Sequence, residues 1–243
     1  MLIEFCVPVY NEEKILKKNA MQLFKYCQKQ KFSFSWKIII LNNGSIDNTN
    51  NICRQIANEK IKIKYIKNQG KGRAIKTYGI KTKADIMVYM DIDLAVSLHY
   101  IPCLIRPIIQ EGVDLAIGSR LLPASKTERS FLRSLSSKSY NLLSKIVLKH
   151  NLSDLQCGFK AIRVNKFKQL IPYIQNNNWF FDTELIAFAN NLGCRIKEIP
   201  VDWQENRYET RKSRVNLISD SMKFIINLIK LKQRMLKIKY LKS

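Results

Sequence analysis

Short apolar runs alternate with amphipathic stretches through the first half of the chain, and this alternation restricts the possible folds more than any other feature. The apolar runs predict buried strands at 2–9, 36–41, 61–66, 85–90 and 113–118. The stretches between them predict helices at 12–29, 47–57, 71–80 and 100–110. Strands joined by helices of this length need crossover connections, so the sequence predicts an α/β fold with a largely parallel sheet and helices on both faces.

The second half of the chain is less regular. Its patterns predict helices at 130–149, 181–191 and 217–240, a strand at 195–203, and an irregular or extended stretch at 154–162. A polar, basic loop at 206–214 precedes the last helix. A length of 243 residues suits one large domain, or a domain with a short appendage.

A polar cluster follows each of the five strands predicted in the first half. In chain order the clusters read YNEE, NNGSIDNT, NQGKG, DID and GSR. Loops at strand ends are polar in any protein, but here carboxylates recur together with residue types that bind phosphate. Because ligands of open α/β sheets bind at the carboxyl ends of the strands, we expect these clusters to form one site.

Asp91 and Asp93 lie just past the fourth predicted strand, in the segment VYMDIDLA. Two carboxylates one residue apart can share a hard divalent cation, Mg²⁺ or Mn²⁺, which prefers oxygen ligands and bridges to phosphates. Such an ion would neutralise the charge that develops on a diphosphate leaving group. Many loops contain Asp-x-Asp, so it is the position after a strand that favours a metal site.

The exit of the first predicted strand carries an aromatic ring beside carboxylates. Pro8 is expected to end this strand, and Tyr10 and Glu12 suit a nucleobase face and a ribose or base N–H. The same segment is also typical of a helix start, with Asn11 as the N-cap residue. Both interpretations can hold together.

Two further clusters contain residues that suit phosphate. Gly70 and Gly72 allow close approach of the backbone, so that Lys71 could reach a phosphate at the start of the third helix. Arg120 and Arg133 lie in a basic stretch after the fifth strand, and Arg suits bidentate recognition of phosphate. A solvated charged loop is the alternative for that stretch.

The charge balance predicts anionic partners. Lys and Arg number 42 and Asp and Glu number 19, which gives a formal net charge of +23. Nucleic acid, an anionic membrane face and phosphorylated substrates all fit this charge. Zinc fingers, RNP motifs and basic zippers are absent from the sequence, and carboxylates follow the strands where a phosphate backbone would dock. We therefore expect no nucleic-acid partner, and a basic nucleic-acid-binding protein is the alternative of a different class.

The last predicted helix combines an apolar stripe with a lysine-rich end. The stripe consists of Ile218, Met222, Ile225, Ile226 and Ile229. Such a helix can lie in a membrane interface, or it can pack on the core with a basic end. The N-terminus does not resemble a signal peptide, and the chain lacks an uncharged apolar run of about 18 residues, so we expect no signal peptide and no transmembrane helix.

Nine segments in this order resemble the family-2 glycosyltransferases of the GT-A fold. The segments are VPVYNEE, NNGSIDNT, GKGRA, DID, GSR, DLQCGFKA, FFDTEL, EIPVDW and SRV. Within the family they look like the polyprenyl-phosphate hexosyltransferases, which include dolichyl-phosphate glucosyltransferases and dolichyl-phosphate mannose synthases. The resemblance implies a GT-A (Rossmann-like) nucleotide-diphospho-sugar transferase domain over 1–215. It leaves 216–243 as a basic amphipathic C-terminal helix for a membrane interface or a partner.

The resemblance also implies a role for each matching residue. The implied donor site comprises Pro8, Tyr10, Glu12, Asn43, Lys71, Arg207 and Arg214. Asp91 and Asp93 would bind the metal and the diphosphate. Arg120 and Arg133 would face the acceptor phosphate. The sugar would lie among Asp154, Gln156 and Asp182, and the implied catalytic set is Asp91, Asp93, Asp154, Asp182 and Arg120.

Two departures from the family pattern bear on specificity. The second motif usually starts with Asp, whereas here it reads Asn42-Asn43, which affects the expected base contact. Mannose synthases often carry Gln where this chain has Ala95, and the segments QCGFK and FDTEL look closer to glucosyltransferases. The sequence thus favours glucose over mannose, and it leaves the donor base, uridine or guanosine, open.

The implied reaction is an inverting transfer of a hexose from a UDP- or GDP-sugar to a polyprenyl (dolichyl) phosphate. A phosphate monoester is already anionic near neutral pH, so this acceptor needs no strong general base. A saccharide acceptor is the alternative within the family. The expected location is the cytoplasmic face of a membrane, with peripheral attachment or a membrane partner subunit.

Overall fold

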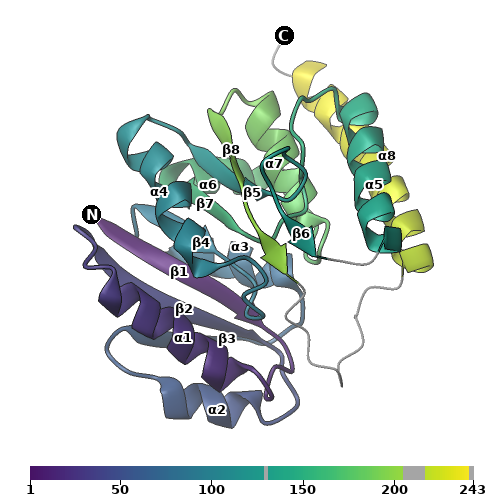
Figure 1. Cartoon of the computed structure of the whole chain (residues 1–243). Coiled ribbons are helices and arrows are strands. Elements are labelled where there is room, and N and C mark those ends of the chain that lie inside the picture. Colours follow the sequence, from purple (N-terminus) through teal and green to yellow (C-terminus); the bar gives the residue numbers. More distant parts are fainter. Residues whose placement is uncertain (129–130, 205–216, 241–243) are drawn as a thin grey trace.

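The structure is a computed structural model that describes residues 1–128, 131–204 and 217–240. Its centre is a seven-stranded sheet of order β3-β2-β1-β4-β7-β5-β8 (Figure 1). The strands are β1 (Leu2–Val9), β2 (Ser35–Asn43), β3 (Ile61–Ile66), β4 (Ile86–Tyr89), β5 (Leu115–Ser119), β7 (Lys160–Arg163) and β8 (Ile196–Pro200). A separate parallel pair joins β6 (Thr127–Glu128) to β9 (Trp203–Gln204).

The helices connect these strands and cover the sheet. They are α1 (Leu16–Lys29), α2 (Thr49–Ile56), α3 (Lys71–Lys81), α4 (Ile101–Gln110), α5 (Phe131–Leu148), α6 (Val164–Leu170), α7 (Phe181–Asn191) and α8 (Leu217–Tyr240). Short 3-10 turns cover Leu98–Tyr100 and Ile171–Tyr173. The predicted α/β fold with a mostly parallel sheet is therefore confirmed.

Apolar side chains on both faces of the central strands explain why helices flank the sheet on two sides. Val7 and Ile40 belong to the core under α1, α2 and α4, whereas Cys6 and Ile39 belong to the core under α3, α6 and α7. Successive residues of a strand point to opposite faces of the sheet, so a continuous apolar run must be covered on both faces. Figure 1 shows the two helical layers in front of and behind the sheet.

Strand β7 is the main departure from a parallel sheet. It lies between β4 and β5 and runs antiparallel to both. The sequence predicts only an extended or irregular stretch at 154–162, and it does not predict α6, which follows β7 without a loop. Placing β7 here brings the segment 154–159 to the carboxyl ends of β4 and β5.

Pro8 lies inside β1 rather than ending it, since the strand continues to Val9. The pairing of β1 with β4 stops at Cys6 and Tyr89, where the Met90 N–H donates to the Cys6 carbonyl. Pro8 therefore faces the side on which β4 has already ended, and its missing N–H removes no ladder bond.

Helices α5 and α8 lie side by side at one edge of the molecule (Figure 1). Leu228, Leu231 and Met235 of α8 are buried in the core shared with α7, and Arg234 pairs with Glu184 of α7. The predicted stripe is not the packed face, because Met222 and Ile226 stay exposed. Within the described ranges, we find no helix that combines the length and apolarity needed to cross a bilayer.

Candidate active site

The polar clusters of the first two strands are tied together by asparagine side chains. The Asn43 amide donates to the Val9 carbonyl at 2.7 Å and accepts from the Gly70 N–H at 2.9 Å, so it joins β1 to the start of α3. The Asn11 N–H donates to Ser45 Oγ at 3.0 Å. These bonds fix the strand exits from which Tyr10 and Glu12 project, both half-buried.

Asn11 does not cap the first helix, so that interpretation of the segment is wrong. Helix α1 begins at Leu16, and the N–H groups of Ile15 and Leu16 both donate to the Glu12 carbonyl. The Asn11 side chain instead accepts from the Ile46 N–H at 2.9 Å, and its φ of 51° lies in the left-handed region that Asn tolerates. The residue thus builds a turn at the strand exit.

Asp91 and Asp93 stand on a tight turn directly after β4. The Leu94 N–H donates to the Asp91 carbonyl at 3.2 Å, and the Ala95 N–H donates to Asp93 Oδ1 at 3.2 Å. Both aspartates line a small pocket together with Gly158 and Trp203. The Asp91 side chain remains 38% exposed.

This turn fits a hard divalent cation through its donor set. Two carboxylates lie at an accessible edge, and Mg²⁺ is commonly held by one or two carboxylates together with substrate phosphates and waters. Across the described part of the chain, no cluster of three or more His, Cys, Asp or Glu forms a complete protein cage.

Lys71 begins α3 and reaches the turn that carries Asp91 and Asp93. Its Nζ lies 2.8 Å from Asp91 Oδ1 and 3.4 Å from Asp182 Oδ2. Burial would lower the pKa of Lys71, but the charges of Asp182 and Asp91 outweigh it and raise the pKa above its ordinary value. Gly70, with a φ of 140°, supports the turn into α3.

Asp182 lies in the first turn of α7 and is buried. Its Oδ1 accepts from Lys160 Nζ at 2.7 Å and from the Tyr89 hydroxyl at 2.9 Å. Burial would raise the pKa of Asp182, yet Lys160 and Lys71 hold it below its usual value. Asp182 is thus linked through Lys71 to Asp91 and its turn.

Arg120 and Asp154 form one buried ion pair. The sequence assigns these two residues to different substrates, Arg120 to the acceptor phosphate and Asp154 to the sugar. Arg120 Nε lies 2.6 Å from Asp154 Oδ2, and Nη2 lies 2.9 Å from Oδ1. Burial would raise the pKa of Asp154, but Arg120 outweighs that effect and lowers it to about 2. The pair is ionised and bidentate, a geometry that fixes both side chains.

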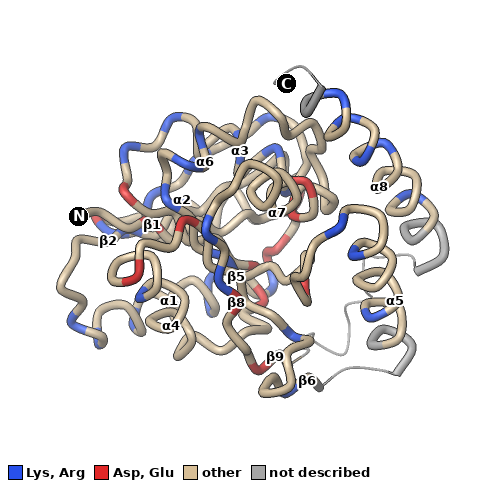
Figure 2. The backbone as a smooth tube through the Cα atoms, turned by 90° about the horizontal axis from the view of Figure 1, so that it is seen from above, with Lys and Arg blue, Asp and Glu red and all other residues tan. Residues whose placement is uncertain are grey.

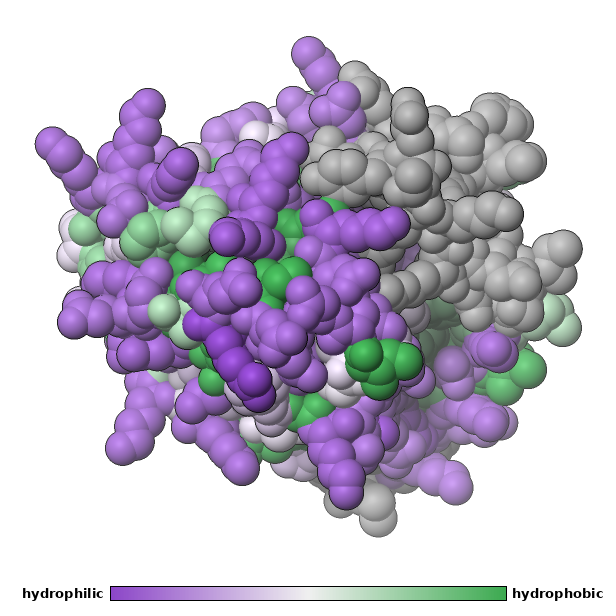
Figure 3. Space-filling view, turned by 90° about the horizontal axis from the view of Figure 1, so that it is seen from below, coloured by the Kyte–Doolittle hydropathy of each residue, from purple (hydrophilic) through white to green (hydrophobic). Residues whose placement is uncertain are grey.

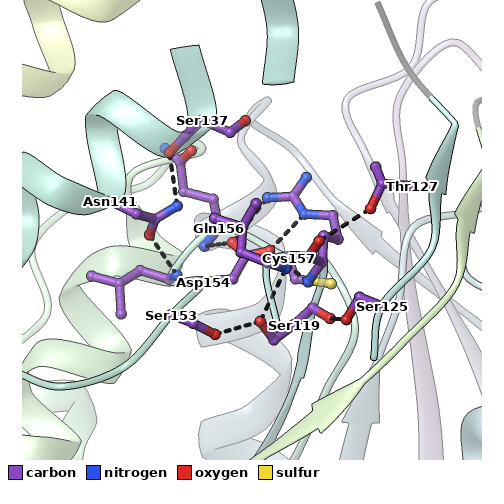
Figure 4. Close-up of polar contacts among 12 residues, drawn as sticks. Ser119, Ser125, Thr127, Ser137, Asn141, Ser153, Asp154, Gln156 and Cys157 are labelled. Carbon is purple, nitrogen blue, oxygen red and sulfur yellow. Dashed lines mark hydrogen bonds and ion pairs between the residues drawn. The ribbon is translucent and has the colours of Figure 1, made fainter. Parts of the chain in front are cut away.

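A network of hydroxyl and amide groups surrounds this pair (Figure 4). The hydroxyls of Ser119 and Ser153 lie 2.5 Å apart, and the Gln156 N–H donates to Asp154 Oδ1 at 3.0 Å. The side chain of Asn141, on α5, accepts from the Leu155 N–H at 3.2 Å. Segment 153–156 is therefore held between β5 and α5.

Three predicted residues cannot be placed at the site. Arg207 and Arg214 lie outside the described residues, and so does the side chain of Arg133, on α5. Their roles stay predictions.

Figure 2 shows acidic residues near the middle of the molecule, between α7 and β5, whereas Lys and Arg are spread over the outer helices.

Sequence reasoning missed Lys160 and Gly158. Lys160 is fully buried beside Asp182, and its position inside an apolar run, between Phe159 and Ala161, was the available signal. Gly158 lies against the Asp91–Asp93 turn, because a Cβ at this glycine would fall 2.0 Å from Asp91 Oδ2. No local pattern distinguishes it from a turn glycine.

A family model described as Glycosyl transferase family 2 matches residues 4–171. The chain belongs to this family. It is therefore a sugar-transferring enzyme, as the motif order predicts. The match contains the strand exits, the Asp91–Asp93 turn and the Arg120–Asp154 pair.

Curated relatives extend the match along the chain. Glycosyltransferase AglD of Haloferax volcanii is 29% identical over 205 residues, which are 83% of this family 2 chain but only 33% of AglD. Dolichyl-phosphate beta-glucosyltransferase ALG5A of Trichomonas vaginalis is 30% identical over 239 residues, 94% of this chain and 72% of the relative.

The fold is similar to solved structures of the GT-A class. Glucosyl-3-phosphoglycerate synthase from Mycobacterium tuberculosis, in complex with Mn²⁺, uridine diphosphate and glucosyl-3-phosphoglycerate, matches with a TM-score of 0.69 and 18% identity. The match covers 95% of this chain and 80% of the synthase. That synthase structure thus holds a divalent metal together with a nucleotide.

Proposed function

We propose that this enzyme transfers glucose from UDP-glucose to a dolichyl or related polyprenyl phosphate, with inversion at the anomeric carbon. The observation that carries the proposal is the convergence of the Asp91–Asp93 turn, Lys71 and the Arg120–Asp154 pair at the carboxyl edge of one sheet. The names of the dolichyl-phosphate beta-glucosyltransferase relatives support the choice of glucose and of the lipid phosphate.

The donor site would be built from the exits of β1, β2 and β4. Tyr10 and Glu12 would contact the base and ribose, with Pro8 and Asn43 shaping the strand exits beneath them. Lys71 would contact the diphosphate from the start of α3, where a helix N-terminus favours anions. We further propose that Arg207 and Arg214 approach the same diphosphate.

Asp91 and Asp93 would hold Mg²⁺ or Mn²⁺. When bound, this ion stabilises the negative charge that develops on the departing nucleoside diphosphate. The Leu94 N–H donates to the Asp91 carbonyl and the Ala95 N–H to the Asp93 carboxylate, so the turn and the Asp93 side chain are positioned before the donor arrives.

The acceptor phosphate would approach from the side of Arg120 and Arg133. One of its oxygens forms a bond to the anomeric carbon while the bond from that carbon to the diphosphate oxygen breaks, and uridine diphosphate leaves. The attacking oxygen is already anionic, so no side chain has to remove a proton. Asp154 positions Arg120, and Asp182 positions Lys71, through the ion pairs described above.

We also propose that the enzyme works at the cytoplasmic face of a membrane, attached peripherally or through a partner subunit. The outer apolar face is defined here by the exposed side chains of α5 and α8: Leu135, Leu142, Ile146, Met222, Ile225, Ile226, Ile229 and Leu236. Figure 3 shows hydrophobic side chains at the edge of the molecule on the α5–α8 side. Lysines on both helices, among them Lys138 and Lys230, suit an anionic leaflet.

Transfer assays with purified protein test the proposed reaction. Radiolabelled UDP-glucose and dolichyl phosphate should give a labelled lipid in the presence of Mn²⁺ or Mg²⁺, and EDTA should abolish its formation. Parallel reactions contain GDP-mannose as donor or a soluble saccharide as acceptor. A product only from GDP-mannose, or only with the saccharide, would contradict the proposal.

A further inference from the structure

We infer that Lys71 is a built-in counter-ion that competes with the divalent metal for Asp91 until the donor diphosphate binds. The inference rests on the proposed function for the identity of the metal ligands and of the donor. It adds a coupling between the two: metal and donor bind more tightly together than either does alone.

The geometry places one ammonium between two carboxylates. Lys71 Nζ is 2.8 Å from Asp91 Oδ1 and 3.4 Å from Asp182 Oδ2, and its side chain is buried. The other oxygen of Asp182 is engaged by Lys160 and Tyr89, so this partner is fixed. Asp91 is the more exposed partner, and it is therefore the carboxylate that can exchange Lys71 for another cation.

The formal charges give this exchange a direction. Among the ion pairs of the described residues, Lys71 and Lys160 balance the charges of Asp91 and Asp182. A divalent ion alone would make the site positive and would stand beside the Lys71 ammonium. The diphosphate of a nucleotide-sugar adds two negative charges and gives Lys71 a new partner at the start of α3. Binding of the donor thus frees Asp91 for the metal.

Gly158 limits the alternatives open to the ammonium. A Cβ at Gly158 would lie 3.0 Å from Lys71 Nζ, so the backbone of this segment covers the ion pair on one side. The ring of Trp179 lies 5.3 Å from Nζ on another. These two neighbours leave Lys71 little room to withdraw from Asp91, so we assign its displacement to a new anionic partner.

Titration calorimetry or Mn²⁺ EPR, with and without UDP and without any acceptor, tests the inference. For the wild type, UDP should increase the affinity for Mn²⁺ by about tenfold or more, within the usual range of coupling between two sites. Lys71→Met removes the competing charge, so Mn²⁺ alone should bind at least about fivefold more tightly, and the increase caused by UDP should fall below about threefold. Lys71→Gln, which keeps the hydrogen-bonding capacity without the charge, should behave in the same way.

Lys81→Met provides the matched control, because Lys81 lies exposed at the other end of α3. It should leave both affinities unchanged. If Lys71 only fastens α3 to α7, the Met and Gln variants will lose stability while Mn²⁺ alone binds equally or more weakly, and the inference is overturned. Failure of the wild type to bind Mn²⁺ even with UDP would instead overturn the proposed metal site and the proposed function with it.

Discussion

At the scale of single residues, the candidate site is a set of paired charges. Lys71, Lys160 and Arg120 each contact a carboxylate, and the exposed fraction of each of these side chains is at most 9%. A buried ion pair is weak evidence for stability, because desolvation offsets most of the attraction. Their concentration at one edge of the sheet therefore points to recognition of charged ligands rather than to a stabilised core.

Replacing Asp91 is the most direct residue-level test of the proposed chemistry. Asp91→Asn keeps the size of the side chain but removes a metal ligand, and we expect glucosyl transfer to fall by about 100-fold or more. Steady-state rates at saturating UDP-glucose and Mn²⁺ measure the loss. Asp85→Asn, at the opposite end of β4, should retain activity because its carboxyl lies away from the Asp91–Asp93 turn and accepts the Leu2 N–H. Full turnover by the Asp91 variant would rule out its role.

His150 should make the stability of the protein sensitive to mild acid. Burial, together with the charge of Lys145, lowers the pKa of His150 to about 4, and its Nδ1 accepts from the Leu152 N–H at 3.2 Å. Because the unfolded histidine titrates near 6.5, stability is fully present above that pH and is lost as the pH falls toward 4. Between pH 7 and 5 the loss should be about 2 kcal/mol.

Urea unfolding at several pH values measures this dependence. His150→Gln should flatten the profile between pH 7 and 5, although the variant starts from a lower stability. His99→Gln, at the only other histidine of the chain and at an exposed position, provides the matched control substitution. An unaltered slope in His150→Gln would show that other groups cause the acid sensitivity.

At the scale of elements, sequence patterns located the regular half of the fold and missed the irregular half. The continuous apolar run of β1 and the alternating apolar and charged residues of β3 give these two strands their observed bounds, because each strand has a pattern that the sequence shows directly. Strand β7 is only four residues long and α6 only seven, too short for periodicity to identify them. The Asp91–Asp93 turn was predictable from strand position, whereas the pairing of Arg120 with Asp154 depends on β7 and therefore on tertiary contacts.

Alanine substitutions at two glycines separate effects on the candidate site from effects on the packing of the surrounding helices. In Gly79→Ala, the new Cβ would meet the Phe167 ring at 2.2 Å and separate α3 from α6, so we expect a loss of about 1–3 kcal/mol in unfolding free energy. In Gly158→Ala, the Cβ would meet the end of the Asp91 side chain, which can rotate away. That variant should lose Mn²⁺ affinity and transfer activity while its stability changes little.

Chemical denaturation and Mn²⁺ titration on both variants separate these two effects. Gly79→Ala should bind Mn²⁺ normally under conditions in which it remains folded. A Gly158→Ala variant with full metal affinity would indicate that the Asp91 carboxyl does not need its present orientation.

At the scale of the whole molecule, the proposed reaction would need two substrates to reach the enzyme from different sides. The nucleotide-sugar is soluble and would enter at the carboxyl edge of the sheet, whereas a polyprenyl phosphate is delivered by a bilayer. Tyr140 of α5 and Phe224 of α8 pack edge to face at 5.4 Å between ring centroids, so the two helices are joined on their inner sides. The side chains of their outer apolar face are exposed, and α5 also holds segment 153–156 through Asn141.

Charge placed on the outer apolar face should separate membrane binding from chemistry. Ile226→Glu and Leu142→Glu each put a carboxylate among exposed apolar side chains, at positions 48% and 62% exposed, so folding should be unaffected. Against an anionic bilayer each substitution loses apolar burial and adds repulsion, and flotation with phosphatidylserine-containing vesicles should fall several-fold. Transfer to a short, water-soluble polyprenyl phosphate should continue at the wild-type rate.

Ile80→Glu provides the control, because it places the same substitution on another surface: Ile80 lies on α3 and is 51% exposed, and this variant should still float with the vesicles. Equal flotation of all variants would exclude this face as the membrane contact, and equal loss in Ile80→Glu would assign binding to net charge alone.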